Sequence, residues 1–551
     1  MNRHAAFGLA LLCTLSCAAC DGPAPSMTPD AGTAPPPTDA ALPSPDDSGS
    51  PPVDASPPAP DAAQPGGDPE VDAPAGLFRG LRSDETDVFL VMPFAASTAG
   101  AQRFTRPVAP PRFERFDATE ASEGCPRLGR RGGVSGDEDC LKLNIWRPRG
   151  ATDRPVMVFI HGGAFVTGNA SDALYDGSDL SAEGPIVVTI DYRIGMLGWL
   201  VSPELQAEAP DGLAGNYGLR DQIRALEWVR DNIASFGGDP DQVTVFGESA
   251  GAMSICALLA TPSAAGLFHR AIVESAAGCE VQHVTEGLDV GARLIDSVGC
   301  GDAADRLECL RSAPIDRLLE AADQLRGGIL DGPRLRPVAE GSFVLQRSVD
   351  APAGVDVPLL VGSNLHEGHG FAAGSGIATH ADYRAHLTDQ FGAQADAVAS
   401  LYPPVSPGAS EAEVLAVVGE IWTDVAFRCP ALELARTQEA LGSPTYLYEF
   451  RRALALTTSE PLAAHGFELF YVFDVFGVRH RAGPDDQTLS DTIQRVWVDL
   501  AETGRIDAHV PPFDSGAPRR LVLDVPVSTD DPTADLDHCD ALADLGVRFG
   551  T

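Results

Sequence analysis

A serine stands in the frame Gly-x-Ser-x-Gly directly after a short apolar segment. The frame is Gly247-Glu-Ser-Ala-Gly251, and the segment before it, Val243–Phe246, has the β-branched and aromatic residues typical of a buried strand. Glycine at both ends of the frame allows a strand to turn sharply into a helix. On such a turn the serine hydroxyl is exposed at the end of the strand. The pattern therefore predicts that Ser249 is a nucleophile, although the frame alone also occurs in ordinary turns.

A glycine-rich segment upstream supports the chemical interpretation. Val156–Ile160 predicts a buried strand, and it runs directly into His161-Gly-Gly-Ala-Phe165. Attack of a serine on an acyl carbon places negative charge on the carbonyl oxygen, and each backbone N–H group that faces this oxygen contributes ~3 kcal/mol. The two segments together predict acyl transfer by a serine enzyme.

Further segments resemble the type-B carboxylesterase family, the cholinesterase-like branch of the α/β-hydrolases, in a bacterial secreted or lipoprotein form. They are Glu138–Asn144, Asp191–Gly195 and Gly215–Gln222, and the resemblance extends over residues 80–545, with its weakest part at the N-terminal edge. The resemblance implies an α/β class protein with the α/β-hydrolase fold, a mostly parallel central sheet flanked by helices. In such folds the site lies at the carboxyl ends of the strands.

The other members of a catalytic triad follow the serine in the order acid, then histidine. Val361–Gly368 resembles the acid segment of the family, which makes Glu367 the carboxylate. Seven histidines lie beyond Glu367, and only His465, in the segment His465–Phe473, stands in a family-like frame. The resemblance implies that His465 takes the serine proton and that Glu367 orients the imidazole. An ordinary imidazole would make activity fall below an apparent pKa of roughly 6 to 7.

The resemblance also assigns the donors of the oxyanion hole to the amides of Gly163, Ala164 and Ala250. Ala164 stands where the family has a third glycine, and it keeps the N–H group while it adds a methyl group. Ser275 resembles a serine of an interior hydrogen-bond network, so we do not expect it to be the nucleophile. Glu248 is open to two interpretations, a charge near the leaving group or a buried polar residue.

The predicted function is hydrolysis of small carboxylic esters through an acyl-enzyme intermediate. Two alternatives remain: a catalytically silent adhesion or binding protein like the neuroligins, and a lipase or amidase that uses the same site. The presence of Ser249, Glu367 and His465 favours an enzyme, since silent members of the family lack the serine. The chain contains no phosphate-binding loop, dinucleotide fingerprint or metal-ligand motif, so we expect no cofactor and no metal.

The N-terminus is typical of an exported protein. Arg3 precedes the apolar run Ala5–Leu15, which is too short to span a bilayer and predicts a signal peptide over residues 1–20. The run ends in a segment that resembles a bacterial lipobox, with Cys20 as the lipidated residue. Cys17 occupies the position that usually holds leucine, so cleavage near Ala19 without lipidation remains an alternative.

Residues 21–75 differ in composition from the rest of the chain. They contain sixteen prolines and ten acidic residues, with no lysine or arginine. Such a segment buries too little apolar surface to offset the entropy of ordering, so it predicts a disordered linker. The catalytic domain is then expected over residues 76–551.

The cysteines also predict export. Of eleven, three precede residue 21, and the remaining eight allow 105 pairings. The resemblance implies Cys125–Cys140, Cys300–Cys309 and Cys429–Cys539. Cys256 and Cys279 remain as a candidate fourth pair, and the sequence leaves open whether they bond to each other. Disulfides persist in oxidising compartments, so we expect a periplasmic or cell-surface lipoprotein, or otherwise a secreted protein.

The net charge of the chain limits its partners. It is −39 at pH 7, which repels nucleic acid over most of the surface. The expected partner is a small-molecule ester, and the expected contact with a membrane is through the N-terminal lipid alone.

Overall fold

The structure is a computed structural model. The predicted signal peptide, Cys20 and most of the predicted linker lie outside the residues that it describes. The described residues are 67–83, 85–129, 132–279, 281–324, 335–345, 355–454, 461–476, 482–506 and 510–550.

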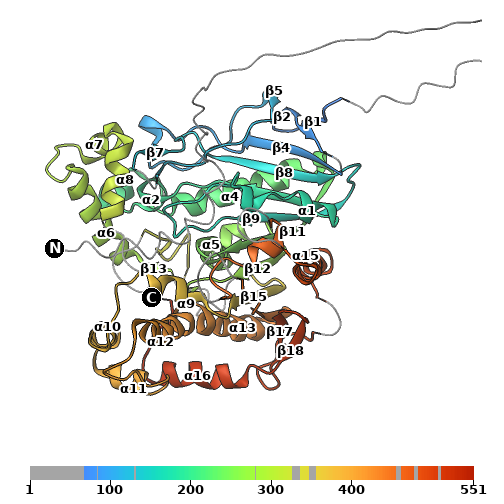
Figure 1. The fold of residues 1–551 in the computed structure, drawn as a ribbon. Coiled ribbons are helices and arrows are strands. Elements are labelled where there is room, and N and C mark those ends of the chain that lie inside the picture. The colour runs from blue at the N-terminus through green and yellow to red at the C-terminus, as the bar shows by residue number, and fades with distance from the viewer. Residues whose placement is uncertain are drawn as a thin grey trace, which may run out of the picture.

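A large twisted sheet forms the centre of the described chain (Figure 1). Seven neighbouring strands run parallel, and antiparallel strands extend the sheet at both edges. In spatial order the strands are β18 (Ser528–Asp530), β17 (Arg520–Leu523), β16 (Thr445–Phe450), β15 (Leu359–Asn364), β12 (Arg270–Glu274), β11 (Gly238–Glu248), β9 (Arg154–Ile160), β10 (Ile186–Ile190), β8 (Lys142–Pro148), β4 (Thr86–Pro93) and β3 (Leu81–Arg82). The strands predicted at Val156–Ile160 and Val243–Phe246 are confirmed as parts of β9 and β11.

Helices cover both faces of the sheet because alternate residues of each central strand point to opposite sides. In β9, Val156 and Val158 face a core that includes Trp228 of one helix and Ile255 of another. Met157 and Phe159 face a second core, which includes Trp497. The first face is covered by α4 (Tyr217–Asn232), α5 (Ala250–Leu259), α13 (Cys429–Leu441) and α16 (Thr533–Asp544), and the second by α1 (Ser178–Ala182), α14 (Leu469–Val472) and α15 (Pro484–Thr503).

The remaining helices form two groups outside these layers. One group shares a third apolar core beside α4 and appears at one side of Figure 1. It comprises α2 (Gly195–Trp199), α3 (Pro203–Glu208), α6 (Val284–Val298), α7 (Arg306–Ser312) and α8 (Ile315–Gln324). The other comprises α9 (Glu367–Ala373), α10 (His380–Phe391), α11 (Ala395–Ala399) and α12 (Glu411–Thr423), and a π-helical turn, Asp424–Arg428, joins α12 to α13. No helix in the described ranges has the length and apolar character needed to cross a bilayer.

A small sheet precedes the main one along the chain and includes part of the predicted linker over residues 21–75. Strand β1 (Glu70–Ala73) pairs with β2 (Gly76–Arg79), which pairs with β5 (Phe113–Asp117). The side chains of Val71 and Ala73 are buried, because the alternation of polar and apolar residues from Glu70 onwards matches a half-buried strand. The ordered domain therefore begins before residue 76. Two further short pairs are β6 (Arg127–Leu128) with β7 (Val134–Ser135) and β13 (Gln282–His283) with β14 (Val338–Ala339).

Four disulfides link the eight cysteines of the described residues. They are Cys125–Cys140, Cys256–Cys279, Cys300–Cys309 and Cys429–Cys539. The last of these closes the longest loop, 110 residues, and joins the start of α13 to α16.

Candidate active site

The serine of the Gly-x-Ser-x-Gly frame lies between the end of β11 and the start of α5. Its backbone is left-handed, with φ 55° and ψ −119°, and its N–H donates to the carbonyl of Glu274 at 3.0 Å. The turn is tight enough that a Cβ on Gly251 would lie 1.8 Å from the carbonyl oxygen of Ile160. The sequence folds in this way because glycine alone allows that approach. Ser249 is thereby presented, half-buried, at the carboxyl end of the sheet.

The glycine-rich loop follows β9 on the neighbouring strand. Three successive residues have positive φ, Gly163 at 111°, Ala164 at 53° and Phe165 at 61°. Within the described part of the chain, the N–H groups of Gly163, Ala164 and Ala250 donate to no other group. Two of these residues lie in the loop and the third follows Ser249, so their amides are free to bind a substrate oxygen.

A buried histidine anchors the start of this loop. The Nδ1–H of His161 donates to the carbonyl of Gly162 at 2.8 Å, and the Tyr192 hydroxyl donates to the carbonyl of His161 at 2.8 Å. Burial lowers the pKa of His161 to about 4, so the imidazole is neutral at neutral pH. His161 therefore supports the backbone of the loop and carries no charge into the site.

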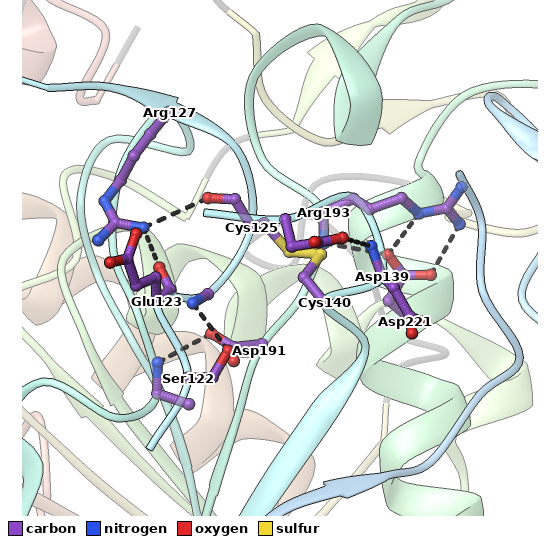
Figure 2. Close-up of a disulfide and its surroundings, with 12 residues drawn as sticks. Ser122, Glu123, Cys125, Arg127, Asp139, Cys140, Asp191, Arg193 and Asp221 are labelled. Atoms are coloured by element: carbon purple, nitrogen blue, oxygen red, sulfur yellow. Dashed lines mark hydrogen bonds and ion pairs between the residues drawn. A yellow bond between two sulfur atoms is a disulfide. The ribbon is translucent and has the colours of Figure 1, made fainter. Parts of the chain in front are cut away.

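A segment closed by the Cys125–Cys140 disulfide (Figure 2) lies next to residues that contact the far end of the loop. Asn169 donates from Nδ2 to the carbonyl of Ser122 at 2.8 Å, and Arg127 donates to backbone carbonyls of the disulfide segment. Asp191, at the end of β10, accepts a backbone N–H of this loop at 2.9 Å. The glycine-rich loop is thus fixed at both ends by contacts from other elements.

Glu367 and His465 contact each other through their side chains. Glu367 is the first residue of α9, just after β15, and its Oε2 lies 2.5 Å from Nδ1 of His465. Its other oxygen accepts the N–H of Asn364 at 2.7 Å. The two loops are also joined through their backbones, because His366 and Ala464 form a β-bridge. The side chains of Glu367 and His465 are both buried.

The second ring nitrogen of His465 faces a carboxylate. Nε2 lies 3.1 Å from Oε1 of Glu248, although the alignment falls short of a hydrogen bond. Within the described residues, Ser249 makes no hydrogen bond to this nitrogen. Burial alone would lower the pKa of His465, but the carboxylates of Glu248 and Glu367 raise it to about 9. The pKa of His465 thus lies above the ordinary imidazole value, because the contact with Glu248 adds a second carboxylate.

Two more glutamates are buried behind the imidazole. Burial, together with the charges of Glu248 and Glu367, raises the pKa of Glu468 to about 8, and burial and Glu468 raise the pKa of Glu274 well above its usual range. Glu468 accepts a hydrogen bond from the hydroxyl of Ser275 at 3.2 Å. Ser275 is fully buried in this network, as expected for a residue other than the nucleophile.

Two phenylalanines pack around the imidazole of His465. The ring centroid of Phe371, from α9, lies 5.3 Å from that of His465, and the centroid of Phe427, from the π-helical turn, lies 4.8 Å away. No motif in the sequence indicated either contact. The sequence gives little indication of these contacts, because neither phenylalanine is close in sequence to His465.

Comparison with known proteins identifies the family of this chain. Residues 67–520 match the model of the carboxylesterase family. The chain belongs to the carboxylesterase family.

Relatives of this carboxylesterase are named as esterases. Fumonisin B1 esterase of Sphingopyxis macrogoltabida is 36% identical over 468 residues, which cover 80% of this chain and 84% of that protein. Para-nitrobenzyl esterase of Bacillus subtilis is 34% identical over 487 residues, 84% of this chain and 96% of that protein. A solved structure of a PNB esterase superposes with a TM-score of 0.75 at 31% identity, over 85% of this chain and 99% of that one.

These comparisons confirm the predictions of family, fold and activity. The carboxylesterase has the α/β-hydrolase fold and is a serine hydrolase of carboxylic esters. Its substrates are small-molecule esters. Within the described residues, no group of three or more His, Cys, Asp or Glu side chains could hold a metal ion.

The structure brings Glu367 and His465, two of the predicted catalytic residues, into contact. Ser249 lies beside Glu248, which contacts the same imidazole. Cys20 alone lies outside the described residues. Sequence reasoning missed the two phenylalanines and the position of Glu248 against Nε2.

Proposed function

We propose that this carboxylesterase uses Ser249 as its nucleophile, His465 as general base and Glu367 as the residue that orients the imidazole. The contact that carries the proposal is the 2.5 Å pair between Glu367 and His465, beside a serine in a strained turn. The amides of Gly163, Ala164 and Ala250 stabilise the oxyanion.

The reaction has two halves, as in other serine esterases. In the first, Ser249 attacks the ester carbon while its proton passes to Nε2 of His465, which then gives the proton to the departing alcohol. In the second, water attacks the acyl-enzyme with the same base and frees the acid. Nε2 must be unprotonated at the start, because it accepts the serine proton. The imidazole must also leave its contact with Glu248 and turn to Ser249.

The favoured substrates are esters with short or medium acyl chains. Membership of the carboxylesterase family supports this preference. The names of the two bacterial relatives, fumonisin B1 esterase and para-nitrobenzyl esterase, also favour soluble esters over emulsified fats.

A panel of p-nitrophenyl esters from acetate to palmitate tests this proposal. We expect the highest kcat/KM among the short and medium chains. Ser249→Ala should lower kcat by about 10⁶ with every ester, since loss of the nucleophile removes the covalent route. Turnover near that of the wild type in this variant would refute the assignment, and strong activation at a lipid surface would refute the substrate preference.

We further propose that the protein is exported, with Cys20 lipidated and the catalytic domain in the periplasm or at the cell surface. Four disulfides support an oxidising location, and the lipobox-like segment supports the anchor. Wild-type protein should fractionate with membranes, and Cys20→Ser should release a soluble, active enzyme, because a multiply acylated cysteine binds a bilayer firmly. An unmodified mature N-terminus in the wild type would contradict the anchor and leave the esterase assignment intact.

A further inference from the structure

Helix α9 begins with the proposed catalytic acid but lacks a cap of its own. Its first residue is Glu367, and the side chain of the preceding His366 makes no capping hydrogen bond. The first N–H groups of a helix have no partner within the helix, and a buried N–H without a partner destabilises the structure. The partner here comes from a different helix.

Thr423, the last residue of α12, supplies that partner. Its hydroxyl accepts the N–H of Gly368 at 2.9 Å and donates to the carbonyl of Gly419 at 2.8 Å. The side chain is fully buried. The two helices touch through their backbones at this point, because a Cβ on Gly368 would lie 2.3 Å from the carbonyl oxygen of Gly419. Thr423 therefore fixes the residue that directly follows Glu367.

The π-helical turn after Thr423 contacts His465 and the backbone two residues before Glu367. Phe427 packs against the ring of His465, and Arg428 donates from Nη2 to the carbonyl of Leu365 at 3.5 Å. A π-helical turn contains an extra residue, and this changes the direction of the side chains that follow it. The turn is followed by Cys429, the first residue of α13, which the disulfide to Cys539 ties to α16. Figure 1 shows α9 and α12 next to each other in the lower half of the view.

We propose that Thr423 is a positioning residue for Glu367 and that the π-helical turn Asp424–Arg428 holds His465 against it. The inference rests on the proposed triad. The contact between Glu367 and His465 depends on where the first turn of α9 lies, and the hydroxyl of Thr423 bonds to that turn. Removal of the hydroxyl lets Glu367 move away from Nδ1 of His465.

The test compares Thr423→Val, Thr423→Ser and Thr261→Val in the full-length enzyme. Valine has the shape of threonine without the hydroxyl, and serine restores the hydroxyl. Thr261 is a matched control, because it is buried and donates to the carbonyl of Ala257 four residues earlier, as Thr423 does to Gly419. Thr423→Val should lower kcat for p-nitrophenyl butyrate by about ten- to a hundredfold, the cost typical of a misplaced catalytic group. KM should stay within about twofold, and Thr423→Ser and Thr261→Val should keep wild-type kcat.

A pH profile separates positioning from a loss of folded protein. The carboxylates of Glu248, Glu367 and Glu468 all raise the pKa of His465. A weaker contact with Glu367 lowers that pKa, so the acid limb of kcat/KM should move to lower pH in Thr423→Val and stay in place in Thr261→Val. A loss of folded enzyme lowers activity at every pH and moves no limb.

Two results would overturn the inference. One is a Thr423→Val enzyme with wild-type kcat and pH profile while Ser249→Ala is inactive, which removes the positioning role and leaves the triad. The other is equal damage from Thr423→Ser and Thr423→Val. If the valine variant does not fold, Phe427→Leu tests the second part of the proposal, that the π-helical turn holds His465 against Glu367. Its kcat and its rate of fluorophosphonate labelling should fall together by about threefold to tenfold. Unchanged rates would overturn the inference.

Discussion

Ser249 and the glycine-rich loop directly follow the adjoining strands β11 and β9, and their shape is determined by the backbone of a few residues. Glu367 and His465 are 98 residues apart. Thr423 of α12 binds the residue next to Glu367, and the π-helical turn after α12 packs against His465. The nucleophile side, which comprises Ser249 and the glycine-rich loop, is a local structure that a short motif can encode. The acid–base side is a tertiary structure, so its precision depends on residues that carry no motif. The two sides should therefore respond differently to mutation.

The largest effect should come from breaking the contact between Glu367 and His465, within the acid–base side. Glu367→Gln should lower kcat by about 10⁴, because a neutral amide no longer stabilises the imidazolium or selects the tautomer. The double variant Ser249→Ala, Glu367→Gln should be no slower than Ser249→Ala alone, since triad residues act as a unit. Steady-state kinetics with p-nitrophenyl butyrate measure both, and additive losses in the double variant would argue against a single triad.

A second substitution tests the local nature of the nucleophile side. Gly251→Ala should destabilise the fold by about 3 kcal/mol or more, because its Cβ would lie 1.8 Å from the carbonyl oxygen of Ile160. Gly408→Ala is the matched control, since a Cβ there meets nothing within 4 Å. Urea unfolding measures the difference. Equal stability of the two variants would show that the turn relaxes and that local backbone does not define it.

The same contrast explains what the sequence could predict. The strands before Ser249 and before the glycine-rich loop were predicted because apolar runs and glycine turns are local signals. Glu367 and His465 were found only through the resemblance to a family, since an acid or a histidine in a loop has no periodicity of its own. The start of the domain was placed too late because Val71 and Ala73 lie among prolines and acidic residues that dominate the composition.

The electrostatics of the site could not be predicted in the same way. The contact between Glu248 and Nε2 of His465 depends on how the loop after β16 returns to the end of β11. No residue pattern near Glu248 specifies that distance. The raised pKa of His465 is therefore a property of the assembled fold.

A third substitution tests that contact. Glu248→Gln removes a charge that raises the pKa of His465, so less of the imidazole is protonated at a given pH. The acid limb of kcat/KM should therefore move to lower pH, by about one to three units, the range for a close opposite charge. In the wild type the limb should lie above the ordinary imidazole value. A limb that stays in place in Glu248→Gln would show that this carboxylate does not control the base.

The smallest effect should appear in stability. The pKa values of Glu248, Glu468 and His465 are raised to about 7, about 8 and about 9, so the folded state holds protons that the unfolded chain releases at lower pH. Stability from these groups is fully present below their unfolded pKa values and is lost as the pH rises through the folded ones. Tm should therefore fall between about pH 5 and about pH 9, and less steeply in Glu468→Gln. A higher Tm at the alkaline end would contradict this sign.

The most direct test of the account is to label the enzyme with a fluorophosphonate and locate the adduct by mass spectrometry. The reagent reacts with a serine that a base has activated. We predict an adduct on Ser249 in the wild type, its loss in His465→Ala, and slow formation in Glu367→Gln. An adduct on Ser275, or labelling of Ser249 at the wild-type rate in His465→Ala, would contradict the assignment of nucleophile and base.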